Sequence, residues 1–202
     1  IGLNLGMHHS QCVEAWFMNV PGLKIVCPST PYDAKGLLHS AIKSNDPVLF
    51  LEHKRLYGTQ EEVPDEPYTI PLSKGDIKRG GSDVTIVATS MMVSRSQEAA
   101  EILADEGIEA EIVDPRTIKP LDKEIILNSV KKTGRLVVVH ESPKFGGFGG
   151  EIAAMVAEEA IDYLQSSIIR VGGREIPVPF ASEEAAVPQV QDIVMAAEKI
   201  CR

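Results

Sequence analysis

The chain has 202 residues, of which 44% are hydrophobic, and a formal net charge of −9 from 20 basic and 29 acidic side chains. This length suits one large or two small domains with a buried core, and no apolar run reaches the ~20 residues of a membrane-spanning helix. The acidic balance argues against nucleic acid, because phosphate binding requires a basic surface. We therefore expect neither a nucleic-acid nor a membrane partner.

The N-terminal part of the sequence predicts a strand, a helix and a second strand in close succession. A short helix is expected at 13–18, and β-branched apolar runs predict strands at 25–27 and 48–51. Thr30 can cap a helix between these strands, and Asn45-Asp46-Pro47 ends it. Its other signals are Pro31 and Asp33 in the first turn, then Ala34, Leu37, Leu38, Ala41 and Ile42 at helical spacing. This is a βαβ unit, the building block of parallel sheets.

A proline- and glycine-rich stretch separates this unit from a second alternating pattern. Residues 58–82 show no clear periodicity and predict a linker over the surface, with the domain boundary near Gly80. We therefore divide the chain into residues 1–57, the linker 58–82 and a second domain at 83–202. In that domain we expect strands at 84–89, 109–114, 135–141 and 168–171, helices at 93–105, 123–132, 150–164 and from 190, and a loop at 115–120. Strands alternating with helices indicate an α/β fold with an open, mostly parallel sheet.

The three cysteines are an odd number and show no CxxC spacing: Cys12, Cys27 and Cys201. This favours free thiols that are buried as small hydrophobic side chains in a reducing compartment. The sequence opens at Ile1 in a glycine-rich run that looks like the middle of a domain. We therefore expect a fragment, and the absence of a targeting peptide carries no weight.

Several strings of the sequence follow the order found in one enzyme family. They are HSQ at 9–11, EAWF at 14–17, PSTPYDAKGLL at 28–38, DPVLFLEHKRLYG at 46–58, DPRTIKPLD at 114–122 and GRLVVVHE at 134–141. In these strings the chain resembles the β subunit of the thiamine-diphosphate-dependent decarboxylase component of 2-oxo acid dehydrogenase complexes. The acetoin dehydrogenases belong to the same group. The resemblance covers roughly the last three-fifths of a family member.

The resemblance implies a fold, an activity and a set of partners. The first part would be the C-terminal portion of a pyrimidine-binding domain, and the second a transketolase C-terminal-like domain with one antiparallel strand. The activity would be oxidative decarboxylation of pyruvate or another 2-oxo acid, with acyl transfer to a lipoyl arm. The partners would be an α subunit and a second β subunit in an α2β2 assembly, and the lipoyl-bearing acyltransferase component. The compartment would be the cytoplasm, or the mitochondrial matrix in a eukaryote.

The cofactor implied by the resemblance is thiamine diphosphate with magnesium, bound mostly outside this chain. The α subunit holds the diphosphate and the metal, and the glutamate that activates the aminopyrimidine lies upstream of Ile1. We therefore assign no cofactor-binding residue here, and we expect the fragment alone to be inactive.

His9 is the candidate catalytic residue. On the residues alone it is an unpaired histidine before Ser10, which favours a surface or capping loop. The family's HSQ histidine lies in the active-site channel and helps to orient or protonate substrate-derived intermediates, and the resemblance carries this role to His9. Family members often have Gln where this chain has His8, and we favour His9 over His8. His9 and Cys12 have H-x-x-C spacing, but two ligands do not make a zinc site.

The turn after the first strong helix is a candidate cation site, because the last carbonyls of a helix lack partners within it. Some relatives bind a structural potassium ion here, and the resemblance gives Ala41, Ile42, Ser44 and Asp46 as its ligands. The alternative is an ordinary capped turn. Relatives often have an acidic residue where Ser44 stands.

The glycine run at 146–150 could suggest a dinucleotide site, since it follows a strand and opens a helix. Its spacing is not G-x-G-x-x-G, and Glu151 would place negative charge where a pyrophosphate binds. We interpret it as a structural turn that allows close helix packing. We interpret Arg116, His140 and Glu141, at strand ends, as interface or structural hydrogen-bonding residues.

Two classes of function remain open. The first is a β-subunit portion of a working decarboxylase, with an acetoin dehydrogenase as the alternative. The second is a non-catalytic module that dimerises β subunits and docks a small basic domain of the acyltransferase. Acidic residues near the C-terminus are the docking candidates: Glu183, Glu184 and Asp192. A transketolase-like synthase is more distant, because the HSQ and STPYDAKG strings argue against it.

Overall fold

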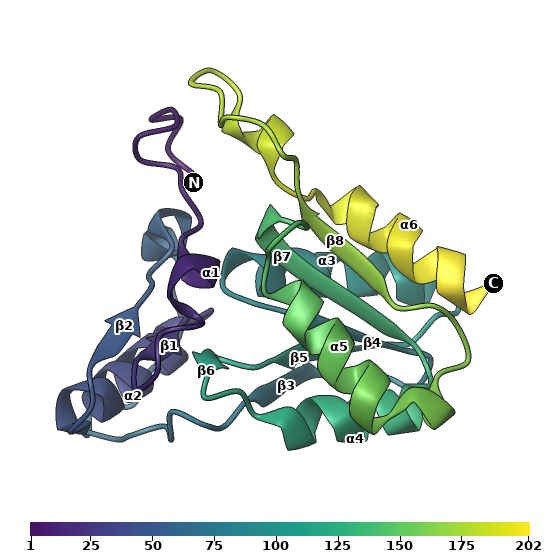
Figure 1. Cartoon of the computed structure of the whole chain (residues 1–202), viewed down its shortest axis with the longest axis horizontal. Helices are drawn as coiled ribbons and strands as arrows, with labels where there is room; N and C mark the ends of the chain where they lie inside the picture. Colours follow the sequence, from purple (N-terminus) through teal and green to yellow (C-terminus); the bar gives the residue numbers. More distant parts are fainter.

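The computed structural model describes residues 1–202 and contains a three-stranded and a five-stranded sheet (Figure 1). In the first sheet, β1 (Lys24–Val26) and β2 (Val48–Phe50) are parallel and are joined by α2 (Pro31–Lys43). Thr30 Oγ1 accepts a hydrogen bond from the Asp33 amide at 3.1 Å, so the predicted cap starts this helix. The predicted βαβ unit is confirmed. It is flanked by the short helices α1 (Glu14–Phe17) and η1 (Lys54–Gly58).

The third strand of this sheet comes from the second half of the chain. β6 (Thr117–Lys119) pairs antiparallel with β1, and the Cys27 amide donates to the Arg116 carbonyl at 2.8 Å. The prediction of a loop at 115–120 was wrong there. Thr and Ile favour extended structure, and β1 offers this short segment a row of backbone partners.

The second sheet has the order β3-β5-β4-β7-β8. Its strands are β3 (Asp76–Arg79), β4 (Val84–Ala88), β5 (Ala110–Asp114), β7 (Leu136–Pro143) and β8 (Ile169–Gly173). All neighbouring pairs are parallel except β3 with β5. This confirms the predicted open, mostly parallel α/β sheet. The antiparallel strand β3 lies inside the segment 58–82, where we expected only a linker.

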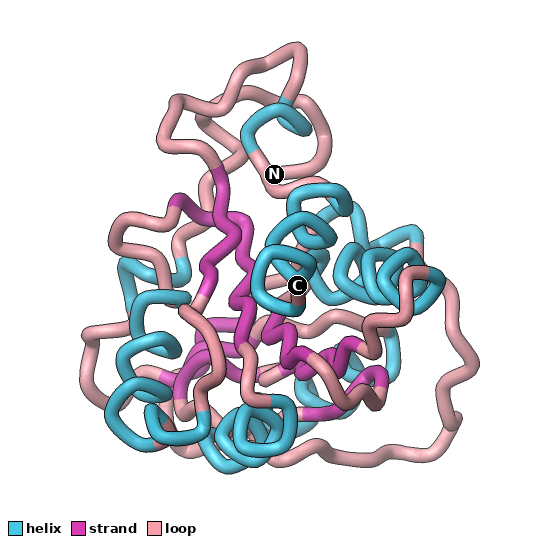
Figure 2. The backbone as a smooth tube through the Cα atoms, turned by 90° about the vertical axis from the view of Figure 1, so that its right-hand side faces the viewer, coloured by secondary structure: helices cyan, strands magenta, loops and turns pink.

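Helices cover both faces of the second sheet, and in Figure 2 they lie around the central strands. α3 (Met91–Asp105) and α6 (Val190–Cys201) pack on one face, in a core of 18 buried residues. α4 (Lys123–Thr133) and α5 (Gly149–Glu159) pack on the other. Two short helices complete the set, η2 (Ile161–Tyr163) and η3 (Glu183–Ala186). No helix is long and apolar enough to cross a membrane.

One of the hydrophobic clusters is shared by the two sheets. Ile25 and Cys27, at β1, belong to the same cluster as Val87 and Val113 of the second sheet, and Ile118 of β6 lies with them. Burying an aliphatic side chain of this size stabilises a fold by about 1.5–3 kcal/mol. The first sheet is therefore held against the second by packing as well as by the β1–β6 ladder.

Candidate active site

A cavity of about 400 Å³ lies where the two parts of the chain meet. The second domain contributes Thr89 and Ser90, directly after β4, and Glu141 in β7. These residues are at the carboxyl ends of parallel strands, the edge at which open α/β sheets bind ligands. The first part of the chain contributes Ile1, His9, Gln11, Cys12, Val13, Glu14, Cys27, Phe50, Leu51, Glu52, His53, Lys54 and Tyr57, and β6 contributes Ile118.

His9 lines this cavity, whereas His8 is not among its lining residues. His9 lies in an exposed turn, in which its amide donates to the Gly6 carbonyl at 3.2 Å. Its own carbonyl accepts from Lys54 Nζ at 3.3 Å. The ring centroids of His8 and His9 are 6.5 Å apart. The structure thus gives His9 access to the cavity, while its catalytic role stays a prediction.

A histidine–carboxylate pair crosses the boundary between the two parts of the chain beside this cavity. His53 Nε2 lies 3.0 Å from Glu141 Oε1, and both side chains are almost fully buried. The His53 Nδ1 atom accepts from the Arg55 amide at 3.2 Å. In the neutral ring the remaining hydrogen is therefore on Nε2, from which it is donated to Glu141. Sequence reasoning missed His53, because its partner is 88 residues away.

Burial disfavours the charged forms of other ionisable groups at the cavity. Burial raises the pKa of the Glu14 carboxyl and also the pKa of the Cys12 and Cys27 thiols. Neither cysteine supplies a thiolate nucleophile at neutral pH, because the thiolate is the reactive form. All three cysteines of the chain are free.

The donors for a diphosphate and its magnesium ion are not assembled by this chain. No group of three or more His, Cys, Asp or Glu side chains is placed to hold a metal ion, and His9 and Cys12 are not part of such a group. The cavity is lined by Glu14, Glu52 and Glu141, whereas Lys54 is its one basic side chain apart from the histidines. The carboxyl groups of Glu52 and Glu141 would disfavour a diphosphate by like-charge repulsion. The residues present therefore do not fit that end of the cofactor.

The turn predicted to hold potassium already contains a cation of the protein. Lys24 Nζ lies 3.0 Å from Ser44 Oγ and 3.0 Å from Asp46 Oδ2, and the Ala41 carbonyl accepts from the Ser44 amide at 3.2 Å. Both side-chain oxygens of the expected set (Ala41, Ile42, Ser44 and Asp46) thus bind an ammonium group. These side chains do not fit a potassium ion in this arrangement, and the ion stays a prediction.

The glycine run packs against a buried histidine. A Cβ at Gly149 would lie 2.6 Å from Nε2 of His140, and one at Gly147 would lie 2.6 Å from its Cε1. Glycine therefore allows the start of α5 to approach the ring, which supports the structural interpretation of this run. Burial lowers the pKa of His140 to about 4, so the ring is neutral at physiological pH. Its Nδ1 is hydrogen-bonded to the Ser142 carbonyl at 2.9 Å.

The structure corrects one of the three expected docking residues, Glu183, and leaves Glu184 and Asp192 at the surface. Glu183 is completely buried, so it cannot face a partner. Glu184 pairs with Arg55 and with Arg95, the latter at 2.7 Å. Asp192 is exposed, and it also caps α6 by accepting from the Gln189 amide at 2.8 Å. In the sequence Glu183 and Asp192 are both acidic residues near the start of a helix, and no local pattern shows that the first is buried and the second exposed.

Comparison with known families agrees with both parts of the structure. Residues 1–60 match the transketolase pyrimidine binding domain, and residues 73–193 match the transketolase C-terminal domain. The chain belongs to the transketolase C-terminal domain family. The matched residues 73–193 contain all five strands of the second sheet.

Individual relatives are similar along nearly the whole chain. The β subunit of the mitochondrial pyruvate dehydrogenase E1 component of Dictyostelium discoideum is 47% identical over 97% of this chain and 57% of its own length. The acetoin:2,6-dichlorophenolindophenol oxidoreductase β subunit of Cupriavidus necator is 49% identical over 98% of this chain and 59% of its own length. The Bacillus subtilis pyruvate dehydrogenase E1 β subunit is 45% identical over 95% and 60%. The chain thus spans less than two thirds of these relatives, and the predicted resemblance is confirmed.

Solved structures show the same fold. A split-gene transketolase, described as an inactive beta4 tetramer, superposes with a TM-score of 0.76 at 26% identity, over 93% of this chain and 61% of its own. A transketolase from Pichia stipitis superposes with a TM-score of 0.64 at 18% identity, over 97% of this chain and 28% of its own. The second likeness concerns the fold alone.

Proposed function

We propose that this chain is part of the β subunit of a thiamine-diphosphate-dependent 2-oxo acid dehydrogenase, acting on pyruvate or another 2-oxo acid. An acetoin dehydrogenase is the alternative. The observation that carries the proposal is identity of 45–49% with β subunits of both kinds along at least 95% of the chain. The position of His9 at a cavity on the ligand-binding edge of the sheet supports it.

In this proposal the chain supplies one wall of the active site. Thiamine diphosphate, when bound, supplies the carbanion chemistry of decarboxylation, and it is held by the upstream part of the subunit and by the α subunit. His9 orients the substrate and exchanges a proton with it, since an imidazole can give or take a proton near neutral pH. The buried His53–Glu141 pair keeps the first domain in register with the second beside this wall.

The proposed partners are an α subunit and a second β subunit in an α2β2 assembly, together with an acyltransferase component that carries a lipoyl domain. Large exposed apolar side chains support protein contacts at the surface beside a second hollow of about 340 Å³, to which Trp16, Phe145 and Ile176 contribute. The free thiols support a reducing compartment, such as the cytoplasm or the mitochondrial matrix.

The test uses the full-length parent β subunit, assembled with its α partner and supplied with thiamine diphosphate and magnesium. Pyruvate, branched-chain 2-oxo acids and acetoin are assayed side by side, and turnover of one of them identifies the substrate. His9→Ala should lower kcat by about 100-fold or more without loss of assembly, with His8→Ala as the matched control. Full activity of His9→Ala would refute the catalytic assignment. Inactivity of a folded complex on all three substrates would favour the assembly module instead.

A further inference from the structure

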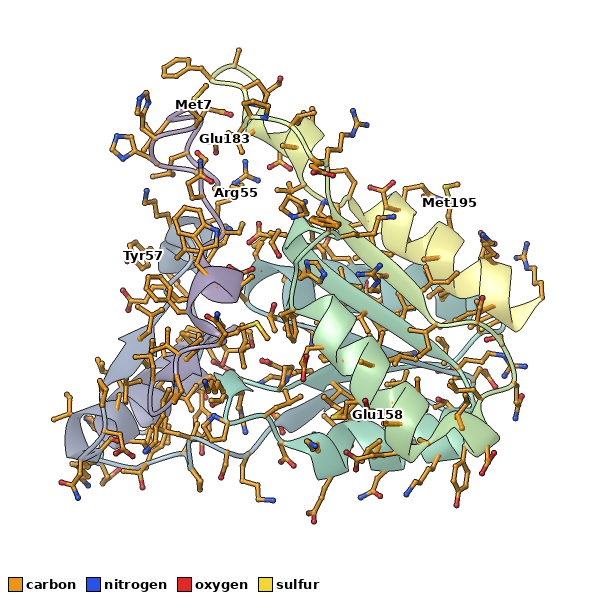
Figure 3. All side chains as sticks on the ribbon, viewed as in Figure 1. Met7, Arg55, Tyr57, Glu158, Glu183 and Met195 are labelled. Atoms are coloured by element: carbon orange, nitrogen blue, oxygen red, sulfur yellow. The ribbon has the colours of Figure 1, made fainter.

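The N-terminal loop is folded around the carboxylate of Glu183, which comes from η3 in the second domain. Glu183 Oε2 accepts from the Gly2 amide at 2.6 Å, and Oε1 accepts from the Leu5 amide at 3.0 Å and from the Ser10 hydroxyl. The Glu183 amide in turn donates to Asn4 Oδ1 at 3.2 Å. In Figure 3, Glu183 lies between the loop that carries Met7 and the C-terminal segment, above Arg55.

The backbone of the loop is shaped for this contact. Gly2, Asn4 and Gly6 all have positive φ, at 121°, 53° and 71°. Left-handed residues that alternate with right-handed or extended ones turn successive amides toward one point and form a concave anion site. Here the anion is a side chain of the same protein, so the loop conformation depends on a residue that lies 173 to 181 positions away in the sequence from the groups that it binds.

The same C-terminal segment holds the loop at further points. A Cβ at Gly6 would lie 3.3 Å from the ring of Phe180, so the two segments are in close contact. Arg55 Nε donates to the Gly2 carbonyl at 2.8 Å, and Arg55 is also paired with Glu184. Residues 180–184 therefore touch the loop directly and through Arg55.

His9 is located between two of these anchors. Its amide donates to the Gly6 carbonyl, and its sequence neighbour Ser10 donates to Glu183. Ser10 is buried whereas His9 is exposed at the cavity. A shift of the Ser10 anchor would therefore move the imidazole relative to the cavity.

We propose that Glu183 is a positioning residue: its buried carboxylate fixes the loop that carries His9, so that the second domain sets the place of this imidazole at the active site. The catalytic part of this inference rests on the proposed function. Burial alone would raise the pKa of Glu183, but hydrogen bonds from Ser10 and from the loop amides lower it to about 2. The carboxylate is therefore charged at neutral pH and makes strong, charge-assisted hydrogen bonds.

The first arm of the test measures the loop itself, without any activity. Amide hydrogen exchange of Leu5 is followed by NMR in the chain and in three variants: Glu183→Gln, Ser10→Ala and the control Glu175→Gln. Glu175 is exposed and lies in the same segment. Exchange should accelerate about 10-fold or more in the first two variants, since a hydrogen bond to a charged group contributes about 1.5–3 kcal/mol, and stay within about twofold in the control.

Ser10→Ala removes one donor on the loop side and leaves the second domain intact, so it decides the question if Glu183→Gln does not fold. Unchanged exchange of Leu5 in the folded variants would overturn the proposal.

The second arm measures kinetics in the assembled full-length enzyme. Glu183→Gln should lower kcat by about 10- to 100-fold, the effect of a misplacement near 1 Å, with KM within about threefold and with unchanged subunit assembly. A purely structural role would reduce the amount of active enzyme and leave its kcat unaltered. Faster exchange with unchanged kcat would overturn the positioning role. If the parent enzyme turns over none of the substrates, the proposed function fails, and the exchange arm still decides whether Glu183 fixes the loop.

Discussion

Asp33 is the buried centre of an ion network that joins the first domain to the second. It lies in the first turn of α2 and is completely buried. Its Oδ2 atom is 2.6 Å from Lys78 Nζ, and its Oδ1 atom is 2.6 Å from Arg116 Nη2. The same two cations also bind Asp76 Oδ2, at 2.9 and 3.0 Å, but Asp76 is 39% exposed. The chain therefore offers two carboxylates with the same partners and different burial.

We expect Asp33→Asn to be far more destabilising than Asp76→Asn. Replacing the buried carboxylate leaves Lys78 and Arg116 to share the single, half-exposed partner Asp76, and breaking a buried charge pair costs about 3–5 kcal/mol. A half-exposed carboxylate contributes only about 0–1 kcal/mol, because water and salt replace much of its interaction. The two variants should therefore differ by roughly 3 kcal/mol, which corresponds to about 6–12 °C in Tm for a chain of this length.

The assay is urea unfolding of the chain and both variants, followed by circular dichroism at neutral pH and moderate salt. The midpoint should fall strongly for Asp33→Asn, with an unchanged slope that shows the same surface exposed on unfolding. Equal losses for the two variants, or a loss below about 1 kcal/mol for Asp33→Asn, would refute the reasoning that burial decides the strength of these pairs.

Three further predictions concern smaller features. Gly149→Ala should lower stability by about 1–3 kcal/mol through overpacking on His140. The control Gly150→Ala, whose Cβ would lie 3.4 Å from its nearest neighbour, should leave the Tm unchanged, and equal Tm values of the two variants would contradict the prediction. Burial raises the pKa of Asp114 from 3.8 to about 6, so its contribution to stability is present below about pH 4 and is lost as pH rises through about 6. Asp114→Asn should flatten that part of the curve of unfolding free energy against pH, and an unaltered slope would show that another group titrates. Lys24→Met should lower the free energy of unfolding by about 0.5–1 kcal/mol. It should also make the Tm rise more in potassium chloride than in sodium chloride, and an equal difference between the two salts in the variant and the parent would show that the ammonium does not occupy the turn.

The elements that sequence reasoning identified carry their signals locally. Thr30 and Asp33 mark the start of α2 within four residues, and the strands of the second sheet are apolar runs flanked by helical periodicity. β6 is only three residues long and lies between Pro115 and Pro120, and its partner β1 lies more than 90 residues earlier. Such a strand is specified by the edge that it meets in the folded protein, so no local pattern indicates it.

The candidate site shows the same limit. His9 was found through its resemblance to a family string, whereas the charge-paired residues around it were missed or misassigned. His53 lies in the string LEHKRLYG, and nothing in that string indicates Glu141 as its partner. Glu183 resembles a solvated acid at a helix start, and only the tertiary structure shows that loop amides surround it. Contacts over such separations depend on topology, which composition and periodicity do not encode.

The β1–β6 ladder has a consequence for exchanging parts between related enzymes. β1 is the middle strand of its sheet, with β2 on one side and β6 on the other. A chimera that joins residues 1–60 of this chain to the second domain of a relative would place a foreign strand against β1 and foreign side chains against Ile25 and Cys27. An unpaired or mismatched strand edge promotes aggregation. The unit that keeps the native strand pairing is therefore discontinuous in sequence: the first domain together with Thr117–Lys119.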